Sequence, residues 1–242
     1  LFTSVDLTGN PEVIFNIYSE DGVVDNNAGT TEFGEYEICP SKDLLDDYLM
    51  DDGTPFTSNT GYETYEFVDE FQNRDPRLYQ SYAYPGWEIE YTSTYATGPQ
   101  GPYIQSLQKN FTGYHQIKAF PNTLDLVSMR SIDIPVIRYA EVLLSYAEAR
   151  AELGELSQAD LDMSINELRS RAGMPDLSMG VAVDPVQDAK YPLVNGSTPN
   201  WQELLEIRRE RRIELAFEGR RYDDLYRWYC GKLLEKEPEG MY

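Results

Sequence analysis

A segment near the end of the chain combines a helical repeat with an unusual density of arginine. Residues 204–228 read LLEIRRERRIELAFEGRRYDDLYRW. On a helix of roughly 100° per residue, Arg208 and Arg212 fall on the same stripe as four apolar residues. Those four are Leu204, Leu205, Leu215 and Ala216. Because an arginine on an apolar stripe must pair its guanidinium or extend it into solvent, the segment predicts a packed helix with acidic partners.

A helical hairpin is predicted upstream of this segment. Residues 138–153 have two apolar faces, and a helix that is apolar on two sides must be packed on two sides. One face holds Ala140, Leu143, Leu144, Ala147 and Ala151, and the other holds Tyr139, Val142, Tyr146, Ala149 and Leu153. Ser157 and Asp160 resemble a capping box that opens a second helix, over 157–172. The pair is as long as one tetratricopeptide unit, about 34 residues, and predicts further helices beside it.

The rest of the chain is predicted to be richer in loops. Residues 11–18 alternate weakly and indicate a short strand. Ser41 and Asp75 are predicted N-caps of short helices within turn-rich, aromatic sequence. We therefore expect one mainly helical structural domain, in which 1–135 form a loop-rich aromatic region and 136–242 a tetratricopeptide-like helical scaffold.

Charge and composition exclude several classes of protein. The chain has 42 acidic and 20 basic residues and a net charge of -22, which repels phosphate and disfavours binding to nucleic acid or anionic lipid. It contains no apolar run of transmembrane length. Cys39 and Cys230 are predicted to be buried thiols, with one disulfide as the alternative. The chain opens at Leu1 on sequence typical of the middle of a domain, which we interpret as a piece of a longer protein.

Neither catalysis nor metal binding is indicated by the residues. His115 is the only histidine, so any histidine-based triad depends on it, and we expect it to be exposed or packed in a loop. Neither cysteine has the neighbours of a zinc site, and the acidic run at 43–52 lacks the spacing of an EF-hand. Acids are too abundant for a glycosidase pair to be recognised. We predict no enzyme activity, metal or cofactor, and keep a glycoside hydrolase as an alternative.

Three blocks in the second half resemble one known family. They are RYAEVLLSYAEA at 138–149, INELRSRAG at 165–173 and ERRIELAFEGRRYDDLYRW at 210–228. Weaker motifs follow the same family order upstream, namely PSKDL at 40–44, DG at 52–53, DPRL at 75–78 and TGY at 112–114 with Lys118. Taken together, the chain resembles the C-terminal half of the SusD/RagB family of outer-membrane nutrient-binding lipoproteins.

The resemblance implies a helical scaffold with long loops and short strands as the ligand face. It implies capture of oligosaccharides by a surface-exposed lipoprotein of the outer membrane, without catalysis, and delivery to a SusC-like TonB-dependent transporter. In this interpretation the family's signal peptide, lipid-bearing cysteine and first helical repeats lie outside the sequence. Peptide capture within the same family is one alternative, and a tetratricopeptide-type adaptor for proteins is another.

Two sets of side chains are candidate sites. Because a sugar ring buries its apolar face on aromatic rings, the predicted ligand-binding residues are Trp87, Tyr82, Tyr84, Tyr91 and Tyr95. The alternative is that these rings pack the loops onto the scaffold. The charged residues of the helices are predicted to form structural ion pairs, with Arg208, Arg212, Arg220 and Arg221 bound to acids such as Glu148, Glu214, Asp223 and Asp224.

Overall fold

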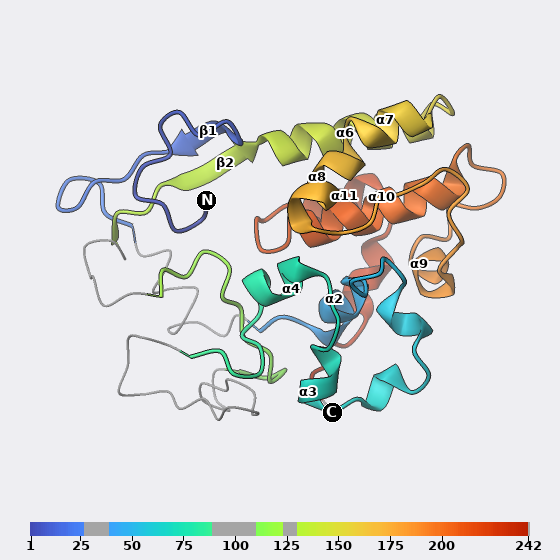
Figure 1. Cartoon of the computed structure of the whole chain (residues 1–242), viewed down its shortest axis with the longest axis horizontal. Coiled ribbons are helices and arrows are strands. Elements are labelled where there is room, and N and C mark those ends of the chain that lie inside the picture. Colours follow the sequence, from blue (N-terminus) through green and yellow to red (C-terminus); the bar gives the residue numbers. More distant parts are fainter. Residues whose placement is uncertain (27–38, 89–109, 123–129, 242) are drawn as a thin grey trace.

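The computed structural model describes residues 1–26, 39–88, 110–122 and 130–241. Figure 1 shows a group of packed helices on one side, from which a two-stranded sheet projects. Within these ranges the sheet has only two strands, so the fold is mainly helical, as predicted. No helix in the same ranges is both long and apolar enough to cross a membrane.

Short elements make up the first part of the described chain. They are β1 (Val13–Ile17), α2 (Lys42–Asp47), the 3-10 helices η2 (Phe56–Ser58) and η3 (Tyr62–Thr64), α3 (Phe67–Glu70) and α4 (Pro76–Ser81). Both predicted N-caps are confirmed. The Ser41 hydroxyl accepts a hydrogen bond from the Leu44 amide at 3.4 Å. The Asp75 carboxylate accepts one from the Arg77 amide at 2.9 Å, so each cap satisfies an amide that the first helical turn leaves open.

Longer helices dominate the second part. Its elements are β2 (Ile134–Arg138), α6 (Tyr139–Glu152), α7 (Gln158–Asp162), α8 (Ile165–Ala172), α9 (Pro185–Lys190), α10 (Trp201–Glu214), α11 (Arg221–Arg227) and the 3-10 helix η4 (Gly231–Glu235). The predicted hairpin is therefore confirmed, although its second arm is divided into α7 and α8. The predicted capping box between Ser157 and Asp160 is present at the start of α7.

The predicted strand at 11–18 pairs with a segment far along the chain. β1 runs antiparallel to β2, with Val13 opposite Arg138 and Ile17 opposite Ile134. Since β2 continues directly into α6 (Figure 1), the sheet is joined rigidly to the helical scaffold.

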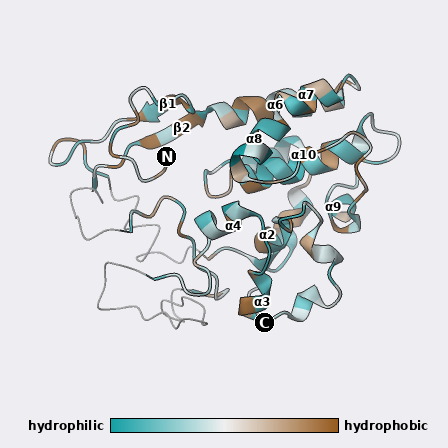
Figure 2. Cartoon of the chain, in the orientation of Figure 1, coloured by the Kyte–Doolittle hydropathy of each residue, from teal (hydrophilic) through white to brown (hydrophobic). Residues whose placement is uncertain are grey.

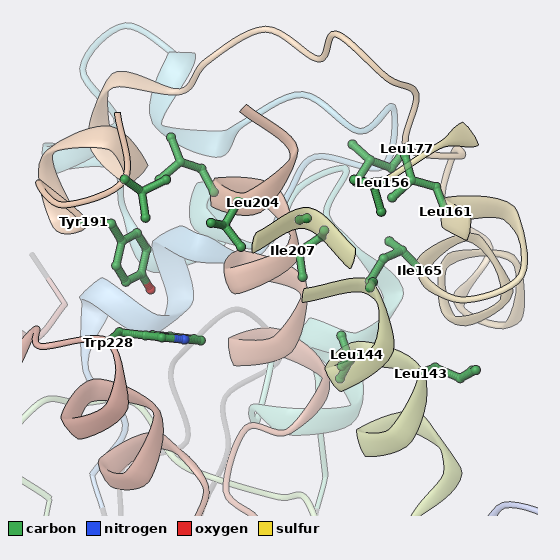
Figure 3. Packing of buried hydrophobic residues seen from close by; sticks show 14 of the residues in the cluster. Leu143, Leu144, Leu156, Leu161, Ile165, Leu177, Tyr191, Leu204, Ile207 and Trp228 are labelled. Carbon is green, nitrogen blue, oxygen red and sulfur yellow. The ribbon is translucent and has the colours of Figure 1, made fainter. Parts of the chain in front are cut away.

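The arginine-rich helix α10 lies at the centre of the packing. It contacts α6 as well as α2 and α9. Figure 3 shows Leu204 and Ile207 of α10 within the larger apolar cluster, which also holds residues of α6 and α8 and the rings of Tyr191 and Trp228. Ile213, near the end of α10, belongs to a second cluster with residues of α2 and α4. Because one helix contributes to both clusters, α10 connects the loop-rich part to the scaffold.

The two apolar faces of α6 have different surroundings. All five residues of the first face are buried in the cluster that contains α10. On the second face, Tyr139, Val142, Tyr146 and Leu153 are 50%, 45%, 38% and 69% exposed. Figure 2 shows apolar segments along β2 and α6. The described residues cover only one side of α6, so the prediction that further helices pack on its second side stays a prediction.

Candidate ligand-binding site

The structure describes three of the five predicted ligand-binding aromatics, since Tyr91 and Tyr95 lie outside the described residues. Tyr82 is fully buried at 0% exposure. Its ring packs edge-on against Tyr48 at 6.0 Å and Phe217 at 5.9 Å between centroids. A ring with no exposed face cannot stack on a sugar, so the assignment of Tyr82 to the ligand is corrected to a core role.

Trp87 and Tyr84 lie at the boundary between core and surface. Trp87 is 8% exposed and packs against Phe120, with 6.4 Å between ring centroids. Tyr84 is partly exposed and contacts both this small cluster and the cluster around Tyr82. Both rings therefore pack onto neighbouring apolar side chains of the fold.

A cleft of about 600 Å³ opens beside these rings. Phe120, the neighbour of Trp87, forms part of its wall. The other walls come from distant parts of the chain, including the first three residues, α4, the segment 117–120, the end of β2, α8 and the end of α10. The cleft therefore lies where the loop-rich part meets the scaffold.

Glu214, at the end of α10, is the central charged group of the cleft. Its carboxylate accepts hydrogen bonds from Arg171 at 2.6 Å and from Arg77 and Arg138 at 3.2 Å. Burial alone would raise the pKa of Glu214, but these three guanidinium groups outweigh it and lower the pKa to about 2. Glu214 is therefore a stable anion that holds α4, β2, α8 and α10 together.

The cationic side chains of the cleft are matched by carboxylates. Arg138 also contacts Glu12 at 2.6 Å, and Lys118 contacts Glu218 at 2.7 Å. With its charges paired, the cleft is polar but close to neutral, which suits hydroxyl groups better than ions. Arg171 keeps 45% of its side chain exposed, so its guanidinium retains donors that face solvent.

Lys118 connects the cleft to the end of α10. Its Nζ donates to the backbone carbonyls of Glu214 at 3.1 Å and Ala216 at 2.9 Å, which the helix end leaves open. Burial lowers the pKa of the Lys118 ammonium. The Phe2 ring lies over it, with 4.5 Å from Nζ to the ring centroid, and presents an apolar surface to the cleft.

The four predicted ion-pair arginines do lie between elements, but their partners differ from those predicted. Arg212 binds Asp43 at 2.7 Å and also Asp47. Arg208 lies over the Trp228 ring at 4.5 Å and is 3.5 Å from Glu152. Arg220 binds Glu141 at 3.1 Å, and the Arg221 guanidinium donates to the Tyr191 hydroxyl at 3.2 Å. The contacts of Arg208, Arg220 and Arg221 join segments of the helical part to one another. Those of Arg212 join α10 to α2.

The predicted acids are also bound by other residues. Glu148 binds Arg227 at 2.6 Å, Glu214 binds the three arginines of the cleft, and Asp224 binds Arg211 at 2.9 Å. Asp223 is exposed on α11. The predicted pairing between the two sets is therefore wrong. The arginines that bind Glu214 come from α4, β2 and α8, and helical spacing within one segment carries no information about such neighbours.

Replacement of Arg212 by alanine is expected to lower the free energy of unfolding by about 3 kcal/mol. The substitution removes one of the two cations that form ion pairs with Asp47, which is 2% exposed, and leaves the pair with Lys190 at 2.6 Å. Lys236→Ala is the matched control, because Lys236 is 3.6 Å from Asp43 but 53% exposed. It should change stability by less than about 0.5 kcal/mol.

Urea denaturation followed by circular dichroism measures both Arg212→Ala and its control. Arg212 does not line the cleft, so ligand affinity of the folded variant should be unchanged. An Arg212→Ala protein that keeps its melting temperature but no longer binds ligand would contradict the structural role.

Arg74 is a structural residue that the sequence did not single out. It is 2% exposed, and its guanidinium donates to the backbone carbonyls of Leu45 at 2.7 Å and Tyr48 at 2.8 Å, at the end of α2. It also donates to Glu70 and lies over the Phe56 ring, 3.7 Å from the centroid. In the sequence, Arg74 directly precedes the motif DPRL at 75–78. This position beside a family motif was the one sequence signal that could have pointed to Arg74.

The histidine and the two cysteines, whose side chains could serve catalysis or bind a metal, are buried or partly buried in the fold. His115 is 4% exposed, and its carbonyl accepts a hydrogen bond from the Ala83 amide at 2.9 Å, as expected for a histidine packed in a loop. Cys39 and Cys230 are both thiols, as predicted, and Cys230 is buried, whereas Cys39 is only partly buried. In the part of the chain that the structure describes, no three His, Cys, Asp or Glu side chains are grouped to hold a metal ion.

Comparisons with known proteins cover almost the whole sequence. A family model described as the SusD family matches residues 11–241. Among solved structures, a SusD-like carbohydrate-binding protein from Bacteroides fragilis NCTC 9343 is similar with a TM-score of 0.70 and 29% identity. That match covers 96% of this chain and 45% of the relative. No curated protein matches the sequence.

Two more distant structures share the fold. A second SusD-like protein from the same strain gives a TM-score of 0.64 at 24% identity, over 93% of this chain and 44% of that one. A SusD superfamily protein from Bacteroides vulgatus ATCC 8482 gives 0.57 at 22% identity, over 97% and 44%. The chain thus spans less than half the length of the solved structures that it matches.

Proposed function

Because this chain belongs to the SusD family, we propose that it is part of a non-catalytic protein that captures oligosaccharides at the cell surface. The observation that carries the proposal is the family match over residues 11–241. The 29% identity to a carbohydrate-binding relative supports the choice of ligand class. We further propose that the protein is an outer-membrane lipoprotein that passes its ligand to a SusC-like TonB-dependent transporter.

We propose the cleft beside Trp87 as the place where a sugar binds. Phe2 and Phe120 offer apolar surface for the CH-rich face of a pyranose ring. The exposed guanidinium of Arg171 donates to hydroxyl oxygens, and the carboxylate of Glu12 accepts from hydroxyl groups. Paired charges hold these groups in place before the ligand arrives, so little side-chain freedom is lost on binding.

Three of the predicted aromatics remain in this proposal besides Trp87. Tyr84 contacts the same small cluster, and Tyr91 and Tyr95 belong to the sequence that follows it. Tyr82 is not included, because it is buried in the core. Peptide capture by the same cleft is the alternative outcome, since guanidinium, carboxylate and phenyl groups also bind peptides.

Replacement of Trp87 by alanine is expected to weaken oligosaccharide binding about tenfold, equivalent to about 1.4 kcal/mol. Isothermal titration against panels of neutral oligosaccharides and short peptides measures the effect. Phe2→Ala tests a residue that lines the cleft itself, at a partly exposed position. Trp201→Ala is the control, because this partly buried tryptophan packs on the scaffold cluster away from the cleft.

These experiments separate four results. Loss of sugar affinity in Trp87→Ala and Phe2→Ala, but not in Trp201→Ala, supports the proposed site. Unchanged affinity of Trp87→Ala for every bound sugar removes Trp87 from it. A wild-type protein that binds peptides but none of the sugars overturns the ligand class, and turnover of a bound sugar overturns the non-catalytic role.

A further inference from the structure

The loop between α9 and α10 contains the only Asn-Gly pair in the sequence, at Asn195 and Gly196. Both residues are exposed, whereas Val194 directly before them is 3% exposed and belongs to the larger apolar cluster. Asn-Gly is a common turn sequence. It also shields the asparagine side chain poorly, because glycine has no Cβ beside its nitrogen. The loop therefore presents an accessible amide next to a fixed anchor.

Hydrogen bonds hold the Asn195 side chain close to the main chain that follows it. The Ser197 amide donates to Oδ1 of Asn195 at 3.0 Å. The ring that this bond closes contains both Cγ of Asn195 and the Gly196 nitrogen. The Thr198 amide donates to the Asn195 carbonyl at 2.6 Å and closes the turn. The side-chain amide carbon is therefore held in the same turn as a backbone nitrogen that can attack it.

The Gly196 nitrogen is available for this attack. Its amide donates no hydrogen bond to any residue that the structure describes. Apart from its chain neighbours, no atom lies within 4 Å of the position that a Cβ on Gly196 would occupy, so water reaches the amide. The Ser197 amide, by contrast, is bonded to Oδ1 of Asn195. That hydrogen bond stabilises the negative charge that develops on Oδ1 when Cγ is attacked.

We propose that Asn195 is a site of spontaneous deamidation in the folded protein. The Gly196 nitrogen loses its proton to water and forms a bond to Cγ of Asn195. The bond between Cγ and Nδ2 breaks, and the leaving nitrogen takes up a proton and departs as ammonia. The product is a cyclic succinimide. Water then adds to either of its carbonyl carbons and opens the ring, which gives aspartate or isoaspartate. One water is consumed and one ammonia released, and no group is oxidised or reduced.

The two products differ in their effect on the turn. Both add a negative charge, but aspartate leaves the length of the main chain unchanged. Isoaspartate carries the main chain through Cβ and Cγ of residue 195 and so inserts one more methylene group. The carbonyl that accepts from the Thr198 amide then no longer belongs to the main chain of the turn. We therefore expect the isoaspartate form to loosen the loop beside Val194.

Peptide mapping of the whole-gene product after incubation in mildly alkaline buffer tests the proposal. Trypsin releases residues 191–208 as one peptide, which carries Asn195 and also Asn200. Asn200 is the internal reference, because the bulky Trp201 follows it. We expect the acid at position 195 to appear as two peaks of equal mass, one of which coelutes with the same peptide from Asn195→Asp. Asn200 should remain an amide.

Gly196→Ala is the matched variant, because it adds a single methyl group beside the attacking nitrogen. The φ angle of Gly196 lies outside the left-handed region, and the added Cβ meets no atom within 4 Å, so the fold accepts alanine. The methyl group hinders the approach of the nitrogen to Cγ. Conversion of Asn195 should therefore be slower than in the wild type by about tenfold or more. The melting temperature should be unchanged.

Three results would overturn the proposal. One is a folded wild-type protein in which Asn195 stays an amide as long as Asn200 does. Another is a single product that coelutes with the Asn195→Asp peptide, because direct hydrolysis without the succinimide gives aspartate alone. Both of these come from the unsubstituted protein and do not depend on the folding of a variant. The third is equal conversion in the wild type and Gly196→Ala, which would exclude the Gly196 nitrogen as the nucleophile.

Discussion

Replacement of Arg74 by methionine is expected to lower the free energy of unfolding by about 3–5 kcal/mol. Its guanidinium donates to backbone carbonyls of Leu45, Tyr48, Leu49 and Glu70. Methionine retains much of the apolar volume but donates no hydrogen bond. The substitution therefore leaves several buried carbonyls unpaired, including those at the end of α2, and each unpaired buried group costs about 1–3 kcal/mol.

The expected loss of stability is large because the charged guanidinium of Arg74 is buried. Burial lowers the pKa of Arg74 to about 10, which still leaves it fully charged at neutral pH. Arg74→Lys keeps the charge but lacks the planar fork that reaches several carbonyls, so an intermediate loss is expected. Arg150→Met is the control, because the Arg150 side chain is 33% exposed and its pairs are worth little.

Equilibrium unfolding in urea at neutral pH gives the free energies of the three Arg74 and Arg150 variants. A typical domain is stable by about 5–15 kcal/mol, so Arg74→Met is expected to be partly unfolded at 37 °C. If Arg74→Met and Arg150→Met unfold at the same urea concentration as the wild type, the carbonyl contacts of Arg74 do not stabilise the fold.

The elements that the sequence predicted correctly are those fixed by local interactions. The N-caps at Ser41 and Asp75 act on amides two or three residues away. The predicted start of α6 differs from the observed one by a single residue. For the two caps the physical cause lies within one helical turn, so a single sequence contains it.

The cleft was not predictable in the same way, because its contacts join residues that are far apart in the chain. Arg77 reaches Glu214 across 137 residues, and Arg138 reaches Glu12 across 126. Nothing in the spacing of charges specifies such pairs. The aromatic prediction failed at Tyr82 for a related reason, since a turn-rich composition does not reveal which rings point into the core.

Replacement of Glu214 by glutamine is expected to lower the free energy of unfolding at pH 7 by about 3 kcal/mol. Glutamine has nearly the same shape but no charge, so Arg77, Arg138 and Arg171 lose their common anion. Glu155→Gln is the matched control, because Glu155 also binds an arginine but is 58% exposed. Its effect should be below about 1 kcal/mol.

The pH dependence separates loss of the Glu214 charge from a change of packing. The pKa of this carboxyl is lowered from 4.5 to about 2 in the folded protein, so its ionised form stabilises the fold fully above pH 4.5. That contribution is lost as the pH falls from 4.5 towards 2. Urea unfolding at pH 7, 4.5 and 3 should therefore show a constant deficit of Glu214→Gln down to pH 4.5 and a shrinking deficit below it. A deficit that persists unchanged at pH 3 would show that shape, rather than charge, explains the role of Glu214.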